Sequence, residues 1–547
     1  MADFRRSIFV LSALAVAFGA ATTASAQNFN CVASVANPPL LRAEGLTELT
    51  GDVVLGCSGG PTTPIQVNVQ VFLNTNVTSR LLANGLTEAL LLVNDPTGVP
   101  NAQVLGQNIY QGTLVASNSV AFLGVVLPAQ PAGGGSLTLR ITNLRANANA
   151  LGVSGPSAPP NPVIETISIT SGVTVANPNQ TVGFVTRGLL APSFSGAVGF
   201  QQCQSTGAVS SGIAAPKTAN TITITEGFAT AFKVQGGGGP TAVPGTVNNT
   251  ESGLIPAGTS SAIGGAGQAD TNTRIQLTFT GVGNGATVLV PTQVTEVVNG
   301  ATVGVLNLVS GASSTTGTLS YLTTTSGVAT AVYDVAQSQP SAIDAFAIPV
   351  SLSFVANPTG NSPVLGPSSV GVSFAPVSTA TTATTGPIPR FANTSTTTGA
   401  FSITACATNL LFPFMTNIAG FDTGLAISNT STDPFGTAAQ TGTCQMNFYG
   451  SGAPGTKVPA TAAVASGASF TTLLSTMAPG FQGYMIATCQ FQYGHGFAFI
   501  TDGFGGPGRG LSQGYLALVI PDTTITGGRT ATPLGLGGAQ AGEELAQ

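Results

Sequence analysis

Hydrophobic and polar residues alternate along much of this chain, which is the pattern of strands that are buried on one face. Successive side chains of a strand point to opposite faces, so a period of two predicts a half-buried strand. Clusters of Gly, Pro, Asn and Ser separate the alternating runs, as expected for turns between antiparallel strands. The clearest alternating runs are residues 65–71, 137–141, 222–224, 275–279, 350–354 and 370–374. No helical period is sustained after residue 26, so the pattern predicts an all-β protein of several antiparallel, immunoglobulin-like β-sandwich domains.

The composition narrows the class of protein further. Only 6% of the 547 residues are charged, against about 25% in an ordinary soluble domain, whereas 43% are hydrophobic. Such a chain is too apolar for charge-driven disorder and too poor in Glu, Lys and Arg for a long coiled coil. Its 14 basic and 19 acidic residues give a net charge of −5, so we expect no nucleic-acid partner.

Residues 1–26 have the organisation of a secretory signal peptide. Arg5 and Arg6 precede an apolar run at residues 8–20, and small residues at 24–26 mark a cleavage site. This run is too short to span a membrane, and no later stretch reaches the required length. We therefore expect an exported mature chain without a transmembrane segment. It would be extracellular or at the cell surface, with the periplasm as the alternative.

Changes in composition along the chain indicate three domains after the signal peptide. The second domain contains a Gly/Pro/Ser-rich loop, and a Thr/Ser/Pro-rich segment of the kind found in extended linkers precedes the third. A flexible tail follows the third domain. The predicted domains are residues 27–186, 187–377 and 401–522, with the loop at 236–273, the linker at 378–400 and the tail at 523–547.

Six cysteines follow the cleavage site, and an even number in an exported chain predicts disulfide bonds. They are Cys31, Cys57, Cys203, Cys406, Cys444 and Cys489. Alternation places Cys444 and Cys489 each on the more apolar face of a strand, so we predict a bond between them. Sequence proximity predicts a second bond between Cys31 and Cys57, and elimination pairs the remaining two. No Cys or His spacing typical of a zinc site is present.

Two glycine-containing motifs match enzyme signatures without the structure that those signatures need. Residues 510–514 fit G-x-S-x-G around Ser512, and His495 is the single histidine of the chain. The histidine precedes the serine and no helix follows, so we do not predict a catalytic triad. Residues 503–508 fit G-x-G-x-x-G, but Pro507 and the lack of a helix predict a loop instead of a nucleotide site.

His495 has the same strand parity as Phe491, Tyr493 and Phe497. This pattern predicts a histidine that packs in an aromatic row of the core and donates to a backbone carbonyl. Contact with a ligand is the alternative. If the histidine is part of the core, its replacement by alanine will lower the thermal stability.

Acidic residues recur at Glu44, Glu48 and Asp52, close to Arg42. We predict that they form a solvated face of a strand whose charge is balanced by the arginine. Calcium binding through carboxylate oxygens and catalysis by paired carboxylates are the alternatives. We predict no cofactor, with calcium as the exception to be tested. Shorter acidic motifs, which lack the ligand series of a calcium loop, lie at Asp270, Asn272 and Asp502.

Four stretches form long and distinctive strings, at residues 41–57, 225–233, 409–431 and 479–502. They resemble an uncharacterised family of exported β-rich proteins from acidobacterial-type soil bacteria. The resemblance implies export and a β-rich architecture. It implies no activity and no catalytic residue.

These observations lead to the hypothesis of an exported, non-enzymatic structural protein of the cell surface or extracellular matrix. Strand edges carry little protective charge, because the lysines are only Lys217, Lys233 and Lys457. Self-association into filaments or a layer, or association with other surface components, is therefore expected. The alternative is an adhesin or glycan-binding protein that binds polysaccharide through loops at a sandwich end. The lack of Trp and the total of 7 Tyr argue against a sugar-stacking platform.

Overall fold

The computed structural model describes most of the chain after the predicted signal peptide. The signal peptide lies outside the described residues, as does all of the predicted tail except two residues. The described residues are 28–94, 105–131, 134–153, 158–202, 204–236, 249–250, 266–356, 363–405, 407–434, 439–455, 460–503, 510–520 and the backbone of 544–545.

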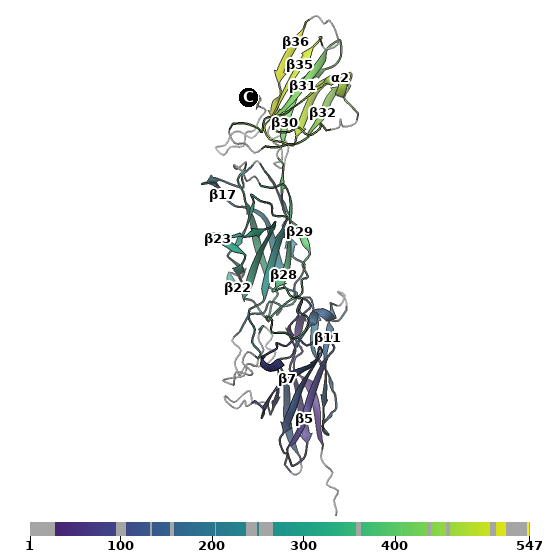
Figure 1. Ribbon diagram of the computed structural model, residues 1–547, viewed down its shortest axis with the longest axis vertical. Helices are drawn as coiled ribbons and strands as arrows, with labels where there is room; N and C mark the ends of the chain where they lie inside the picture. Colours follow the sequence, from purple (N-terminus) through teal and green to yellow (C-terminus); the bar gives the residue numbers. More distant parts are fainter. Residues whose placement is uncertain are drawn as a thin grey trace, which may run out of the picture.

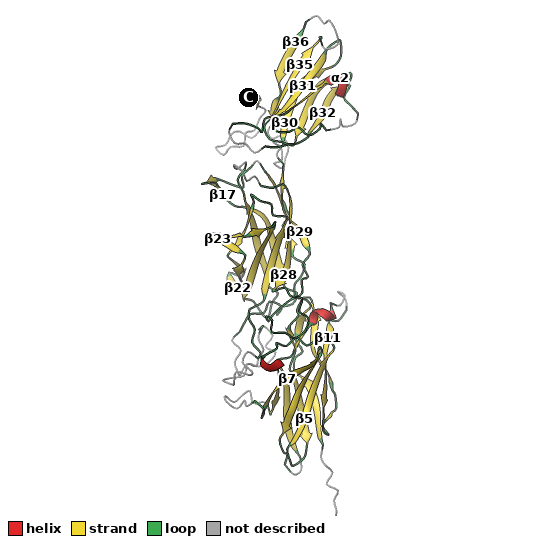
Figure 2. Cartoon of the chain, in the orientation of Figure 1, coloured by secondary structure: helices red, strands yellow, loops and turns green. Residues whose placement is uncertain are grey.

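The chain forms three lobes that follow one another along the long axis of an elongated molecule (Figure 1). Almost all regular structure is strand, as Figure 2 shows. Each lobe has its own cluster of buried apolar side chains. The protein is therefore all-β and built from sandwich-like units, as the alternation predicts. The predicted domain boundaries stay a prediction.

The first lobe is a single eleven-stranded sheet that folds over on itself around the first core. Its strand order is β12-β1-β4-β9-β6-β7-β8-β5-β11-β13-β2, and β3 pairs separately with β10. The elements are β1 (Phe29–Val35), β2 (Leu40–Arg42), β3 (Glu48–Leu49), β4 (Val53–Gly59), β5 (Ile65–Leu73), the 3-10 turn η1 (Ala83–Gly85), β6 (Leu86–Val93), β7 (Ile109–Ala116), β8 (Ser119–Leu127), β9 (Gly135–Thr142), β10 (Arg145–Ala146), the 3-10 turn η3 (Ala148–Leu151), β11 (Asn161–Ile169), β12 (Thr174–Val175) and β13 (Asn179–Thr186).

The second lobe is a sandwich of two sheets around the second core. One sheet has the order β14-β18-β27-β20-β24-β23, and the other β15-β29-β28-β19-β26-β22-β21 with β25 beside β26. The strands are β14 (Ser193–Phe194), β15 (Val198–Gln201), the hairpin β16 (Val209–Ser210) and β17 (Ile213–Ala214), β18 (Lys217–Thr225), β19 (Arg274–Thr280), β20 (Thr287–Pro291), β21 (Gln293–Val298), β22 (Ala301–Ser310), β23 (Ala312–Thr316), β24 (Leu319–Leu322), β25 (Thr324–Thr325), β26 (Val328–Gln337), β27 (Ala345–Ser353), β28 (Gly366–Ala375) and β29 (Thr397–Thr404).

The third lobe is a smaller sandwich around the third core. Its sheets have the orders β32-β34-β30-β37-β38 and β33-β31-β35-β36. The two described residues of the predicted tail form the last strand. The elements are β30 (Thr408–Thr416), β31 (Asp422–Asn429), β32 (Cys444–Ser451), β33 (Ser469–Leu473), the short helix α2 (Leu474–Met477), β34 (Gln482–Cys489), β35 (Gly494–Thr501), β36 (Ser512–Leu516), β37 (Leu518–Ile520) and β38 (Glu544–Leu545).

The alternating runs of the sequence all lie in strands. In β5, for example, Val67, Val69 and Val71 are buried in the first core, while Gln66 and Asn68 face outwards. A period of two thus places every second side chain in the core. The other five predicted runs lie in strands that include them or end within one residue of them: β9, β18, β19, β27 and β28.

The segment at residues 378–400 differs from the extended linker that its composition predicts. It runs along the boundary between the first and second lobes, where Arg390 and Phe391 are buried. The Leu46 amide donates to the Arg390 carbonyl (2.9 Å), and Gly45 forms a β-bridge with Phe391. The Thr/Ser/Pro-rich composition of the segment does not indicate that Arg390 and Phe391 are buried. The second and third lobes follow each other closely in the chain, since β29 ends at Thr404 and β30 begins at Thr408.

Among the described residues, no helix has the length and apolar character that a membrane crossing requires.

Candidate functional site

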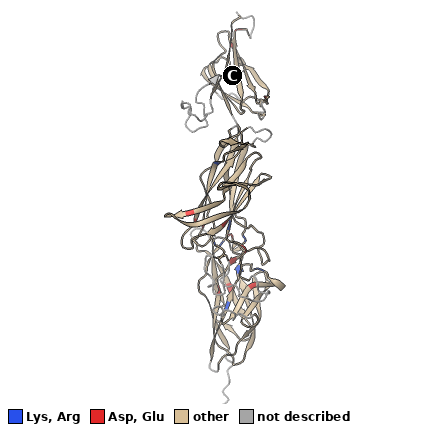
Figure 3. Cartoon of the chain, turned by 90° about the vertical axis from the view of Figure 1, so that its left-hand side faces the viewer, with Lys and Arg blue, Asp and Glu red and all other residues tan. Residues whose placement is uncertain are grey.

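Charged side chains are buried together where the first and second lobes meet, and we call this group the junction cluster. Its members are Arg42, Glu44, Glu48, Glu88, Arg145, Lys233 and Arg390. Such residues are almost never fully buried unless they are paired. In a chain with only 6% charged residues, their concentration at one place is notable. Figure 3 shows blue basic and red acidic segments near this boundary. We take the junction cluster as the candidate functional site.

Arg42, at the end of β2, connects the two lobes through several contacts. Its guanidinium forms a salt bridge with Glu48 (2.7 Å) of the first lobe. It also donates to the Ala231 carbonyl (3.1 Å) and to the Thr273 hydroxyl (2.8 Å) of the second lobe. The same group lies 4.7 Å from the ring centroid of Phe391. The planar, delocalised guanidinium is suited to this position because it can hydrogen-bond and stack at the same time.

Glu48 and Lys233 are charged partners of the arginine in this buried environment. Burial alone would raise the pKa of Glu48, but the positive charges of Arg42 and Lys233, together with hydrogen bonds from Arg42, hold this pKa below its usual range. Burial lowers the pKa of Lys233 to about 8, although Glu48 acts in the opposite direction. These ions depend on one another, because a buried charge that loses its partner is strongly destabilising.

A second buried ion pair joins Arg145 of β10 to Glu88 of β6, with 3.0 Å between Nε and Oε1. The Arg145 guanidinium also donates to the carbonyls of Thr47 (3.3 Å) and Thr250 (3.2 Å). Glu88 accepts from the Gly267 amide (3.1 Å). Thr250 and Gly267 belong to the predicted Gly/Pro/Ser-rich loop of the second domain. Its described residues are therefore bonded to the first lobe at these two points.

Glu44 holds the chain where it passes from the first lobe into the second. Its carboxylate accepts hydrogen bonds from the amides of Gly188 (2.9 Å) and Leu189 (3.4 Å), just after β13. Its own carbonyl accepts from the Ala392 amide (2.9 Å). Burial raises the pKa of Glu44, and the hydrogen bonds from Gly188 and Leu189 oppose this effect. Glu44 thus holds the segment at residues 188–189, where the chain enters the second lobe, and also the segment at residues 378–400 through Ala392.

Arg390 orders the segment at residues 378–400, to which it belongs. Its guanidinium donates to the carbonyls of Ala380 (3.1 Å) and Thr382 (2.8 Å), and its amide donates to the Thr47 hydroxyl (3.1 Å). Burial lowers the pKa of this arginine to about 10, with a further lowering by Arg145. The segment is consequently tied to the first lobe by its backbone and to itself by its side chain.

The junction cluster therefore has the properties of a mechanical coupling. A rotation of one lobe against the other would break several charge-assisted hydrogen bonds together, and each of these bonds lies in a low-dielectric environment. The carboxylates are occupied by guanidinium groups and backbone amides. Within the part of the chain that the structure describes, no group of His, Cys, Asp or Glu side chains could hold a metal ion.

The acidic residues noted in the sequence do not form a solvated face. Glu44 and Glu48 are buried in the junction cluster, whereas Asp52 lies apart, with 4.0 Å between its carboxylate and the Arg140 guanidinium. The prediction of a solvated face is wrong because the chain turns between these residues instead of continuing as one strand. Arg42 does balance their charge, but within the protein interior. The other cluster members are isolated charges in apolar stretches of the sequence, and no motif links them to one another.

Glu165 of β11 is a buried carboxyl outside the junction cluster, and its titration gives a testable prediction. Burial, together with the nearby charge of Asp52, raises its pKa to about 8 from 4.5. The folded protein then keeps a proton that the unfolded chain releases near pH 4.5. We expect the free energy of unfolding of the first lobe to fall between about pH 4.5 and 8, by at most about 1.4 kcal/mol per pH unit. Urea denaturation across this range measures the slope.

The variant Glu165→Gln is the control for this titration. It keeps the shape of the side chain and cannot ionise, so its stability should decline less steeply with pH than that of the wild type. Equal slopes for the two proteins would show that the carboxyl is not protonated in the folded state.

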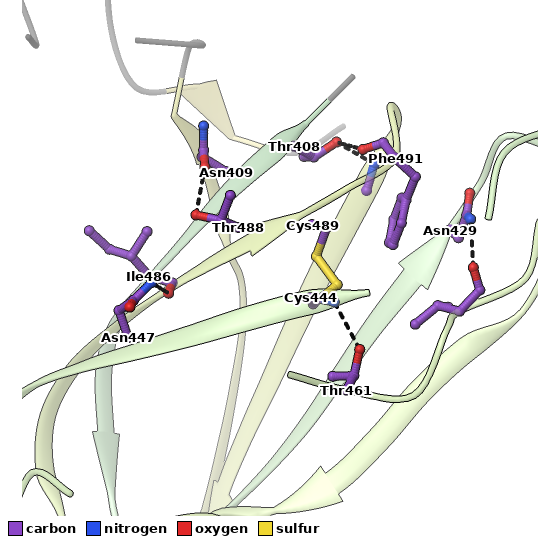
Figure 4. The surroundings of a disulfide bond; sticks show 12 residues. Thr408, Asn409, Asn429, Cys444, Asn447, Thr461, Ile486, Thr488, Cys489 and Phe491 are labelled. Carbon is purple, nitrogen blue, oxygen red and sulfur yellow. Dashed lines mark hydrogen bonds between the residues drawn. A yellow bond between two sulfur atoms is a disulfide. The ribbon is translucent and has the colours of Figure 1, made fainter. Parts of the chain in front are cut away.

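Two disulfide bonds lie within the described residues, each between adjacent antiparallel strands. Cys31 of β1 is bonded to Cys57 of β4, and Cys444 of β32 is bonded to Cys489 of β34 (Figure 4). In both cases the two cysteines are direct register partners and belong to a buried core. These are the two pairings that parity and proximity predict. The predicted third pair, Cys203 and Cys406, lies outside the described residues.

His495 does not occupy an aromatic row of the core. It is half-buried on the outer face of β35, and Phe497 on the same face is 43% exposed. The inward positions of β35 carry small residues because the facing sheet fills the space. A Cβ added to Gly496 would lie 2.6 Å from the ring of Phe412. The prediction of a core histidine is therefore wrong, since it placed the bulky side chains of the strand inside.

Because His495 lies on the outer face, its replacement is no longer expected to lower the stability. We expect His495→Ala to change the free energy of unfolding by no more than about 0.5 kcal/mol, as for other surface positions. Gly496→Ala, at the next residue, should destabilise by about 1–3 kcal/mol because the added methyl group overpacks the core. Thermal unfolding of both variants measures the contrast. A larger loss for the histidine variant than for the glycine variant would restore the core assignment.

Among the described residues, Ser512 and His495 do not come together. Ser512 pairs with Thr501, which is six residues along β35 from His495, a separation of about 20 Å along a strand. Asp270 is paired with Arg80 (2.6 Å), and Asp502 accepts from the Leu511 amide (3.1 Å). Asn272 donates to Asp334. The glycine-rich motif at residues 503–508 lies almost wholly outside the described residues.

Comparison with known proteins gives no family for this chain. No protein-family model and no curated protein matches it. Solved structures with some likeness include the serine-rich repeat protein Srr2 of Streptococcus agalactiae, with 9% identity, 64% of this chain and 88% of that chain covered, and a TM-score of 0.20. The T6 backbone pilin of serotype M6 Streptococcus pyogenes has 8% identity, coverage of 90% and 81%, and a TM-score of 0.21. The CupB6 tip adhesin of Pseudomonas aeruginosa has 8% identity, coverage of 69% and 99%, and a TM-score of 0.15. Likenesses at these TM-scores carry no argument about function.

Proposed function

We propose that this chain is an exported, non-enzymatic structural protein in which the first two lobes form one stiff unit of an elongated spacer at the cell surface or in the extracellular matrix. The observation that carries the proposal is the junction cluster, which fixes two sandwiches through buried ion pairs. Neighbouring domains move relative to one another by default unless their interface is extensive. A chain that places its rare charges in such an interface is suited to transmit or resist force.

Export is supported by the disulfide bonds and by the signal-like sequence at residues 1–26. Disulfides persist in oxidising compartments and are rare in the reducing cytosol. Both described disulfides also cross-link strands within a core, which is a suitable arrangement for a protein that must keep its shape outside the cell.

Self-association is supported by one exposed edge strand of the second lobe that carries no charge. The edge strand β23 (Ala312–Thr316) is exposed at every position and contains neither a charged residue nor proline. Edge strands without such protection offer unpaired backbone groups to another chain. Pairing of this edge with a second copy would build a filament or a layer.

Electron microscopy with antibodies against the mature chain tests this proposed function. We expect label outside the cell, on extended particles or on filaments and layers, in both shed and cell-attached material. Label confined to the cell interior, or turnover of a substrate in an activity screen of the purified chain, would contradict the proposal.

A further inference from the structure

The outer face of the sheet β32-β34-β30 carries an unusual combination of side chains, and we call it the tyrosine face. Cys444 and Met446 of β32 point into the third core, so the alternate residues of this strand point outwards. The same parity holds on β34, where Met485 and Cys489 point inwards. The outward residues of the two strands include Gln445, Asn447, Tyr449, Tyr484, Ile486 and Thr488.

Two tyrosines form an exposed stacked pair at one end of the tyrosine face. Tyr449 and Tyr484 are direct cross-strand partners, with 5.0 Å between ring centroids and an angle of 15° between ring planes. They are 45% and 43% exposed. On the next strand, the bulge of β30 beside Tyr484 presents Phe414, which is also 45% exposed. Two of the 7 tyrosines of the chain are thus held in register to form one aromatic surface.

The other end of the tyrosine face presents neutral hydrogen-bonding groups. The Thr488 hydroxyl donates to the Asn409 side-chain oxygen (2.9 Å), and the Asn447 amide donates to the Ile486 carbonyl (3.5 Å). Figure 4 shows these four residues on adjacent strands. The row of Gln445 and the row of Tyr449 are four positions apart on β32, which is about 13 Å along a strand. No residue of these rows carries a charge.

We propose that the tyrosine face binds a neutral polysaccharide chain. A pyranose ring has an apolar face of C–H groups and a rim of hydroxyls, so its recognition needs an aromatic surface next to uncharged donors and acceptors. Each ring of the stacked pair has one face turned away from its partner, and these two faces offer aromatic surface to the C–H groups of a sugar. The amide and hydroxyl side chains supply the uncharged donors and acceptors. A charged glycan or peptide would find no opposite charge in these rows. The site lies on a sheet face and not in the end loops. It is a small stacking platform in a chain without Trp and with 7 Tyr, because two of these tyrosines are direct cross-strand partners.

Affinity electrophoresis of the full exported chain in gels containing soluble mixed-linkage β-glucan, with calorimetric titration of cellohexaose, tests this site. We expect retardation of the wild type. The double variant Tyr449→Ala/Tyr484→Ala should bind about tenfold more weakly or worse, because aromatic anchors dominate the affinity of such contacts. Tyr449→Phe should bind as well as the wild type, since it keeps the stacking ring and removes the hydroxyl.

The matched control is Tyr493→Asn, which removes an exposed tyrosine of the same lobe outside the tyrosine face. Tyr493 has a φ of 59°, a conformation that Asn tolerates well. This control should retain wild-type binding, and circular dichroism should show that all variants are folded. Three results would overturn the proposal. The first is a wild type that does not bind β-glucan, xylan, chitin hexaose or dextran. The second is glycan binding that survives in the double alanine variant, and the third is a double alanine variant that loses self-association while neither it nor the wild type binds a glycan.

Discussion

Replacement of Arg42 by alanine is expected to lower the free energy of unfolding of the first two lobes by about 3–5 kcal/mol. The variant leaves the Glu48 carboxylate buried beside Lys233 alone and removes the bonds to Ala231 and Thr273. It also removes the cation from the ring of Phe391. Because these groups span two lobes, a transition that involves both lobes in the wild type should separate into two steps. Calorimetry and urea denaturation measure the loss and the separation.

Two further variants distinguish a lost coupling from a general loss of stability. Arg274→Ala removes an arginine of the second lobe that is paired with Asp334 and one-third exposed, so it should cost no more than about 1 kcal/mol. Arg42→Met with Glu48→Leu and Lys233→Met removes all three interdependent buried charges and should recover part of the stability. If the alanine variants of Arg42 and Arg274 behave alike, the junction does not depend on its buried ion pair.

Removal of the Cys444–Cys489 bond is expected to destabilise the third lobe by about 4 kcal/mol in the chain-entropy model. The bond closes a loop with a sequence separation of 45, which restricts the unfolded chain. The loop contains strands from both sheets of the lobe, β32 and the whole of β34 from one sheet and β33 from the other. The double variant Cys444→Ala/Cys489→Ala should therefore unfold this lobe first. Limited proteolysis followed by mass spectrometry would locate the first cleavages.

The corresponding double variant at Cys31 and Cys57 is the control for location. It should weaken the first lobe and leave the proteolysis of the third lobe unchanged, because these cysteines belong to a separate core. Cleavage that begins in the first lobe after loss of the Cys444–Cys489 bond would contradict the assignment of independent cores.

The strands and two disulfide pairings could be predicted because they depend on short-range patterns. The parity of Cys444 with Met446 and of Cys489 with Met485 is visible in a few residues, and it determines which face points into the core. The same rule failed for His495, because parity identifies two faces without showing which one is buried. There the small residue Gly496 faces inwards against Phe412, a neighbour more than 80 positions away in the sequence.

The junction cluster could not be predicted because its partners are far apart in the chain. Thr47 and Arg390 are separated by 343 positions, and Arg42 and Thr273 by 231. Each charge on its own is typical of a solvated side chain. The sequence feature that indicates buried charges is a single charge within an apolar stretch, as at Glu88 in β6. In a chain with so few charges, such positions favour buried pairs.

The most direct measurement of the central claim is the distance between the first and second lobes in solution. Spin labels attached to unnatural amino acids at the exposed positions Leu123 of β8 and Val309 of β22 would leave the cysteines untouched. Double electron–electron resonance should give one narrow distance peak for the wild type and a broad distribution for Arg42→Ala. A broad distribution in the wild type would show that the buried charges do not couple the lobes, and the account of a stiff structural unit would be wrong.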